Sequence, residues 1–80
     1  MKKSFKSGDI VLYENTGVKE LGIVKRENNK GDGYFVFYST GDTAANTSSE
    51  EIEKVENYED HADAINFNIF AEMISTHLPD

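Results

Sequence analysis

The chain has 80 residues, a net charge of −7 and no cysteine. This length corresponds to one small domain, and the lack of cysteine excludes disulfides, thiolate metal sites and thiol nucleophiles. No apolar run approaches the roughly 20 residues of a membrane-spanning helix, and the basic N-terminus leads into Gly8-Asp9 rather than an apolar signal region. We therefore expect a cytoplasmic protein without membrane association.

Three strands are expected in the first half of the chain. The runs Asp9–Glu14 and Glu20–Glu27 are rich in β-branched and apolar residues, and Asn15–Lys19 between them has the composition of a turn. Gly22 lies inside the second run, which indicates a bulge, a bend or a close backbone crossing. Tyr34–Ser39 is apolar on both faces, as expected for a strand at the centre of a small barrel.

Shorter elements are expected in the middle of the chain. Thr43–Thr47 is a weaker, polar strand candidate. Ser48 and Glu51 have the spacing of a capping box that opens a single helical turn. Ile52 is expected to enter the core from that turn, and Glu53–Glu56 is the fifth strand.

The C-terminal residues change to helical periodicity. Asn57 is expected to cap a helix over Tyr58–His77, and Pro79 prevents its continuation. Ile65–Ile69 also alternates with period two, so a strand there is the competing interpretation. One apolar stripe of the helix consists of Tyr58, Ala62, Ile65, Ile69 and Met73.

A second apolar stripe lies on another side of the predicted helix, and we take it as a candidate interface. If only the first stripe packs on the sheet, the second remains exposed, and large exposed apolar patches mark interfaces. The alternative is that the helix lies in a groove and buries both stripes. The residues of this second stripe are Phe67, Phe70, Ile74 and Leu78.

The order of these elements is similar to that of SH3-like small barrels, which include the Tudor, chromo-like and KOW groups. The resemblance is carried by Phe5–Val11, Leu21–Val24, Tyr34–Val36 and Ser48–Val55. It implies a mainly β protein, with a five-stranded SH3-like barrel over residues 1–56. The C-terminal helix, residues 57–80, is expected to pack on the barrel as part of the same domain.

The opening residues also resemble the RNA-polymerase-interacting module of the CarD family. The matching residues are Phe5, Gly8-Asp9, Val11 and Tyr13, followed by Gly17-Val18 and Gly22-Ile23. The aromatic–proline step that often follows the first strand in that family is absent, because Tyr13 is followed by Glu14.

The acidic excess is unevenly distributed along the chain. Residues 1–30 hold seven Lys or Arg and four Asp or Glu, a net charge of +3, whereas residues 31–80 hold one Lys and eleven Asp or Glu, a net charge of −10. The densest acids are taken as a candidate partner-binding face, with a merely solubilising surface as the alternative. These acids are Glu50, Glu51, Glu53, Glu56, Glu59, Asp60 and Asp63.

Aromatic residues form the other candidate binding surface. Tudor-type barrels often hold a cation between aromatic side chains, and the resemblance makes Tyr13, Tyr34 and Tyr38 the candidates, with Asp42 as an acidic partner. The alternative is that they are ordinary strand residues covered by the helix. A small basic patch is formed by Lys19, Lys25, Arg26 and Lys30 with Tyr34, but direct nucleic-acid binding is not expected of such an acidic chain.

No constellation of residues indicates catalysis. His61 and His77 lie sixteen residues apart in the sequence, too far to share a metal on one helix. Neither a nucleophile elbow nor a phosphate-binding loop is present. We expect no enzyme, no catalytic residues, no cofactor and no metal.

The sequence therefore predicts a small non-enzymatic protein-binding module with an acidic surface, and a homodimer is an open alternative to the monomer. A second hypothesis is an inhibitor or nucleic-acid mimic, of the kind that phages and other mobile elements encode, acting on a basic host protein. A third is a Tudor- or KOW-like module associated with transcription or nucleic acid.

Overall fold

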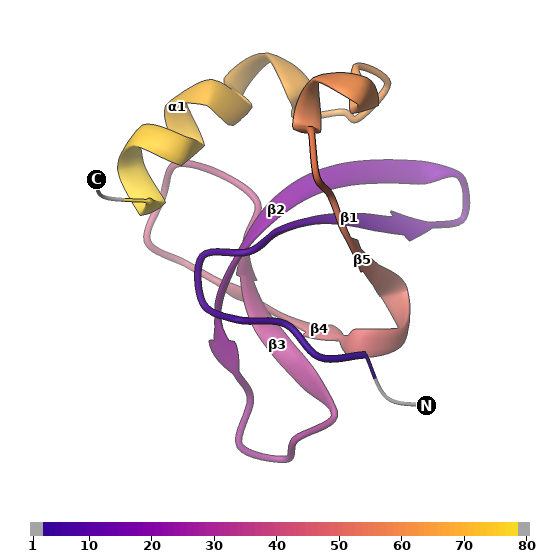
Figure 1. The fold of residues 1–80 in the computed structure, drawn as a ribbon, viewed down its shortest axis with the longest axis vertical. Helices are drawn as coiled ribbons and strands as arrows, with labels where there is room; N and C mark the ends of the chain where they lie inside the picture. Colours follow the sequence, from indigo (N-terminus) through magenta and orange to yellow (C-terminus); the bar gives the residue numbers. More distant parts are fainter. Residues whose placement is uncertain (1–2, 79–80) are drawn as a thin grey trace.

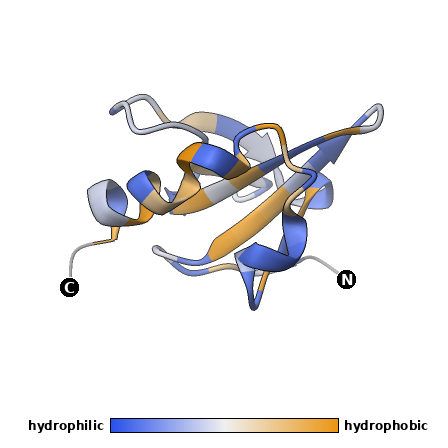
Figure 2. Cartoon of the chain, turned by 90° about the horizontal axis from the view of Figure 1, so that it is seen from above, coloured by the Kyte–Doolittle hydropathy of each residue, from blue (hydrophilic) through white to orange (hydrophobic). Residues whose placement is uncertain are grey.

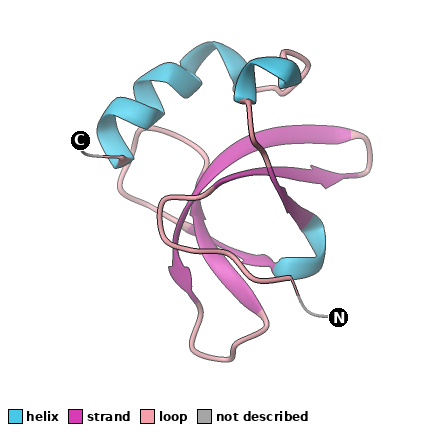
Figure 3. Cartoon of the chain, in the orientation of Figure 1, coloured by secondary structure: helices cyan, strands magenta, loops and turns pink. Residues whose placement is uncertain are grey.

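The structure, a computed structural model, describes residues 3–78, so Pro79, expected to end the helix, lies outside the described residues (Figure 1). Five antiparallel strands form one sheet in the order β4-β3-β2-β1-β5. Two 3₁₀ turns and one α-helix complete the chain (Figure 3). The bounds are β1 Ile10–Asn15, β2 Val18–Glu27, β3 Gly33–Phe37, β4 Ala45–Ser48, η1 Ser49–Glu51, β5 Ile52–Lys54, η2 Tyr58–His61 and α1 Phe67–His77.

The predicted fold class is confirmed, because the protein is mainly β with one C-terminal helix. This arrangement is in line with an SH3-like fold. The expectation of a barrel needs correction, however, because the sheet is not closed. Among the described residues β4 and β5 are the two edge strands. η1 connects them along the chain, but they do not pair with each other.

The β1–β2 hairpin forms where the sequence predicts a turn. Thr16 and Gly17 both have positive φ, 52° and 84°, and Asn15 pairs with Val18 across this two-residue loop. Two central residues with positive φ give the turn a twist that matches the twist of the strands. Gly17 is therefore required by the backbone of the turn.

Gly22, for which a bulge, a bend or a close crossing was expected, lies where neighbouring side chains approach the β2 backbone closely. A Cβ atom at this position would overlap with Val36 Cγ1 and with the ring of Tyr38. Only glycine lets β2 pass this closely over the side chains of β3.

The sheet carries a hydrophobic cluster on each face. One cluster is centred on Leu21, Ile23, Phe70 and Met73, which pack the sheet against α1. The other lies on the opposite side and consists of Val11, Val24, Tyr34, Val36 and Ile52. Figure 2 shows orange, apolar segments both on the strands and on the helix. Leu21 and Ile23 thus face α1, whereas Val24 faces the other cluster, and the register of β2 against β3 shifts between Val24 and Arg26.

The long C-terminal helix predicted over Tyr58–His77 is wrong in its first half. Asn57 caps only η2, where its side chain accepts a hydrogen bond from Glu59 N, and the α-helix begins at Phe67. The strand alternative for Ile65–Ile69 is not observed either. No helix within residues 3–78 combines the length and apolar composition needed to cross a membrane.

Contacts with β2 explain the break between η2 and α1. Ile65 N donates to Lys19 O at 2.8 Å, and the Asn66 side chain bonds both backbone groups of Leu21. These bonds direct the backbone of residues 62–66 toward the sheet instead of along a helix axis.

Candidate functional site

Two of the three tyrosines predicted to form an aromatic surface come together in the structure. Tyr13 lies on β1 and Tyr38 directly follows β3, and their ring centroids are 5.8 Å apart in an edge-to-face arrangement. The Tyr38 hydroxyl lies 3.0 Å from Thr47 Oγ1, and the Tyr13 hydroxyl accepts a hydrogen bond from Asn15 Nδ2 at 3.0 Å. Both rings are half-buried, so each is held in position and still reaches solvent.

Tyr34, the third predicted tyrosine, does not belong to this surface. Its side chain is only 3% exposed, and its hydroxyl accepts a hydrogen bond from Phe5 N at 3.1 Å. The Phe5 ring also contacts the Tyr34 ring edge-on at 5.3 Å. Tyr34 is therefore a core residue that fixes the N-terminal segment to the sheet.

Two glutamates line the cavity beside Tyr13 and Tyr38. Asp42, which was expected as the acidic partner of the tyrosines, is not among the lining residues. Glu20 pairs with Tyr13 across the β1–β2 hairpin, and Glu51 ends η1. The cavity has a volume of about 240 Å³, and we call it the Tyr13–Tyr38 pocket. Its lining residues are Tyr13, Glu20, Tyr38, Ala45, Asn46, Thr47 and Glu51.

The electrostatics of this pocket favour positive charge. Burial, as the largest cause, raises the pKa of the Tyr38 hydroxyl to about 12; the hydrogen bond with Thr47 opposes the rise, and Glu20 and Glu51 add to it. The hydroxyl therefore stays neutral at physiological pH. A cation in the pocket would meet two carboxylates and two aromatic side chains, whereas an anion would be repelled by the carboxylates.

A second acidic cavity adjoins the pocket through Glu51. It is lined by Lys3 and Leu12 together with four glutamates, and the Lys3 ammonium lies 3.9 Å from the Glu53 carboxylate. We define the glutamates of the two cavities as the η1 acidic cluster, which consists of Glu14, Glu20, Glu50, Glu51 and Glu53.

The structure divides the predicted acidic face into two groups. Glu50, Glu51 and Glu53 belong to the η1 acidic cluster. Glu56, Glu59, Asp60 and Asp63 lie beyond β5, around η2, at the other end of that strand (Figure 1). Asp63 accepts a hydrogen bond from Lys19 Nζ at 2.9 Å, and this bond lowers the pKa of the Asp63 carboxyl.

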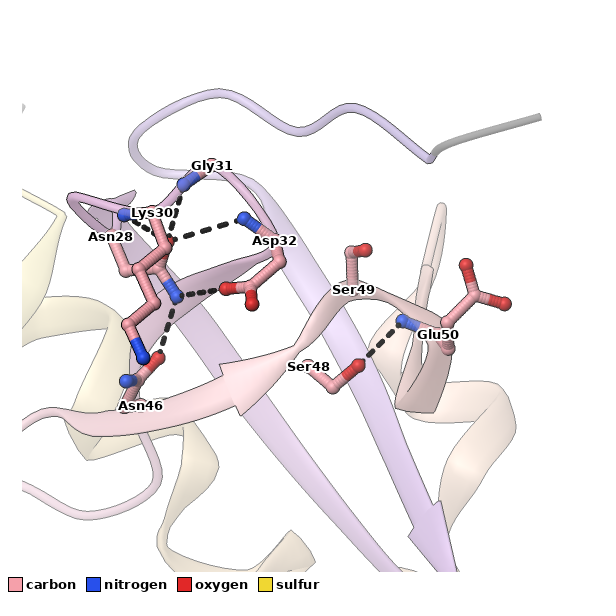
Figure 4. Close-up of a pocket in the computed structure, with 8 residues that line it drawn as sticks. All are labelled: Asn28, Lys30, Gly31, Asp32, Asn46, Ser48, Ser49 and Glu50. Atoms are coloured by element: carbon pink, nitrogen blue, oxygen red, sulfur yellow. Dashed lines mark hydrogen bonds between the residues drawn. The ribbon is translucent and has the colours of Figure 1, made fainter.

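A further cavity of about 460 Å³ lies between the β2–β3 turn and the start of η1 (Figure 4). The Asn28 side chain makes several hydrogen bonds at this cavity. Its oxygen accepts hydrogen bonds from the backbone N–H groups of Lys30, Gly31 and Asp32. Its amide nitrogen donates to Asp32 and to Asn46 on β4. The Asn28 side chain is thus used to shape the turn, and the cavity wall mixes both signs of charge.

The apolar stripe predicted as an interface is not an exposed surface. Phe70 is fully buried, and Phe67, Ile74 and Leu78 pack against the cluster between sheet and helix. α1 therefore turns this stripe toward the sheet. Two residues of the other stripe are exposed instead, Ile65 at 68% and Ile69 at 39%.

The basic residues of the first half do not form the predicted patch with Tyr34. Lys19 is engaged by Asp63, and the Lys25 ammonium and the Arg26 guanidinium lie over the rings of Phe37 and Phe35, at 5.7 and 4.5 Å. Among the described residues, no three His, Cys, Asp or Glu side chains are placed to hold a metal ion.

Sequence reasoning missed Glu20 and Asn46 as pocket residues. Glu20 could have been found by counting pairs outward from the turn, which places it opposite Tyr13. Asn46 lies on a weak polar strand, and its position depends on the path of the chain between β3 and β4.

Comparisons with protein-family models, with curated proteins and with solved structures found no match to this chain.

Proposed function

We propose that this protein is a small non-enzymatic binding module that holds a lysine- or arginine-containing segment of a protein partner. The observation that carries the proposal is the Tyr13–Tyr38 pocket, where two aromatic rings and two half-buried carboxylates line one cavity. Cations bind to aromatic faces and to carboxylates, and both interactions strengthen where water is partly excluded.

The surroundings of the pocket support a chain of several residues rather than a lone cation. Glu51 is shared with the second acidic cavity, so the η1 acidic cluster extends the negative surface beyond the pocket. A field of one sign attracts an oppositely charged partner during encounter and repels nucleic acid. A basic, unfolded protein segment is the partner that this surface fits.

The experiment measures binding of a fluorescent peptide in which lysine alternates with threonine. We expect wild-type protein to bind this peptide, with an affinity that falls as the salt concentration rises. We expect no binding of a peptide in which glutamate replaces lysine. The double substitution Glu20→Gln with Glu51→Gln is expected to weaken binding about tenfold or more, because partly buried carboxylates interact strongly with a cation. Glu59→Gln with Asp60→Asn, which removes the same charge at η2, is the matched control.

Equal losses of affinity in the pocket variant and the η2 variant would mean that net charge alone attracts the peptide. This result would refute the Tyr13–Tyr38 pocket as the binding site. Failure of wild-type protein to bind the lysine peptide would refute the function itself.

A further inference from the structure

The two edges of the sheet are β4 and β5, and the hydrogen bonds show which backbone groups each edge turns outward. Along an antiparallel strand, successive residues point their N–H and C=O groups alternately to the two sides. Val55 N donates to Ile10 O, so by alternation Glu53 bonds β1, while Ile52 and Lys54 turn outward. This assignment agrees with the bond that Ile52 O accepts from Lys3 Nζ at 3.2 Å on the outer side.

The β5 edge is protected against pairing with another strand. It is three residues long, carries the charged side chains of Glu53 and Lys54, and has one outward carbonyl occupied by Lys3. Charged residues and short length are the usual means by which proteins block an edge strand.

The β4 edge is also short, at four residues, but it carries no charged side chain. Ser49 N donates to Asp32 O, so by the same alternation Thr47 and Ala45 bond β3, and the backbone groups of Asn46 and Ser48 turn outward. Ala45, Asn46 and Ser48 are exposed, and β4 contains no charge and no proline. Within residues 3–78, no other strand pairs with this side of β4.

We propose that the outer edge of β4 binds an extended basic segment of the partner as an additional strand, an inference that rests on the proposed function. Asn46 and Ser48 would supply main-chain bonds, as in other cases of strand addition. Asn46 and Thr47 also line the Tyr13–Tyr38 pocket, so a lysine or arginine of the added strand reaches Glu20 and Glu51.

Charge complementarity identifies the occupant. The two cavities that include β4 residues contain the carboxylates of Glu20, Asp32, Glu50 and Glu51 against the single ammonium of Lys30. A basic strand therefore finds opposite charge on both sides of β4, whereas an acidic strand or a second copy of this acidic chain does not.

Ser48 offers a test with a matched control. Its φ of −63° already suits proline, so Ser48→Pro removes one outward N–H without changing the backbone conformation. Ser48→Ala removes the same hydroxyl, which accepts a bond from Glu50 N, and keeps the N–H. We expect Ser48→Pro to weaken binding of the lysine–threonine peptide by about tenfold or more and Ser48→Ala to leave it within about twofold.

A second measurement uses wild-type protein, so it does not depend on the fold of a variant. Two further peptides carry N-methyl groups, one on every lysine and the other on every threonine. Because only alternate N–H groups of an added strand face β4, we expect one methylated peptide to bind about tenfold more weakly or worse and the other to bind like the parent.

Equal binding of all three peptides would refute strand addition and leave the proposed function standing. If wild-type protein does not bind the parent peptide, both proposals fail. A dimer in light scattering that Ser48→Pro converts to monomer would assign the β4 edge to a second copy and refute a basic partner there.

Discussion

The buried amide of Asn66 joins the sheet to the helix. Its Oδ1 accepts from Leu21 N at 2.8 Å, and its Nδ2 donates to Leu21 O at 2.6 Å and to Tyr38 O at 3.0 Å. β3 pairs with β2 only as far as Ile23, so the Asn66 amide takes the place opposite Leu21 that a longer β3 would have occupied.

Asn66→Ala is expected to lower the free energy of unfolding by about 2–3 kcal/mol, because it leaves buried backbone groups of Leu21 and Tyr38 without partners. Urea unfolding measures this loss. Asn68→Ala, an exposed position near the start of α1, serves as the control and is expected to change stability by less than about 0.5 kcal/mol. Equal losses of stability in the two variants would show that the hydrogen bonds of the Asn66 amide do not stabilise the fold.

The Tyr38 hydroxyl is expected to make stability depend on alkaline pH. Its pKa is about 12 in the folded protein against 10.0 for the free side chain. The unfolded chain therefore loses this proton first, and the free energy of unfolding falls as pH rises from about 10 to about 12. Urea unfolding across this range should show a shallower decline for Tyr38→Phe, and parallel curves would contradict the assignment.

Individual residues differ in how far the sequence predicts them. A turn was expected around Gly17, and a close approach of neighbouring groups was one of three alternatives for Gly22. Asn66 was not expected, because its role depends on where β3 ends and on a backbone forty-five residues away in sequence.

At the scale of elements, α1 completes the larger core. Phe70 and Met73 are fully buried against Leu21 and Ile23, and the Phe70 ring lies 5.0 Å from that of Tyr58. The helix therefore contributes to the same domain as the sheet.

Phe70→Ala is expected to lower the free energy of unfolding by about 3–5 kcal/mol, because it leaves a cavity in this core. Phe70→Leu is expected to lose less stability, so it can be compared with the wild-type protein if the alanine variant does not fold. Ile69→Ala, a partly exposed neighbour on α1, should cost less than about 1 kcal/mol in thermal or urea unfolding. A cost for Ile69→Ala as large as that for Phe70→Ala would contradict the observed orientation of the helix.

The strands could be predicted and the C-terminal segment only in part. β1, β2 and β3 appear within two residues of their expected bounds, because β-branched and aromatic runs between turn residues are strong local signals. Helical periodicity over residues 58–77 was a weaker signal than the tertiary bonds that Ile65 and Asn66 make with β2. Periodicity also could not decide which stripe would face the sheet.

At the scale of the whole molecule, the sheet is open, and its two edges differ. The β5 edge carries charge and is occupied in part by Lys3, whereas the β4 edge is polar, uncharged and bordered by the η1 acidic cluster. The sequence predicted the acidic segment and two tyrosines of the pocket. It could not show that they meet beside an edge strand, because that proximity depends on the register of β1, β2 and β5. The inhibitor, the transcription-associated module and the homodimer stay predictions.

The most direct test is an NMR titration of isotope-labelled protein with the lysine–threonine peptide, followed by mapping of the backbone amide shifts. The account predicts the largest changes at Asn46 and Ser48 on β4 and at Tyr13 and Tyr38, with small changes at η2. Changes centred on Glu59 and Asp60, or on Lys25 and Arg26, would contradict it.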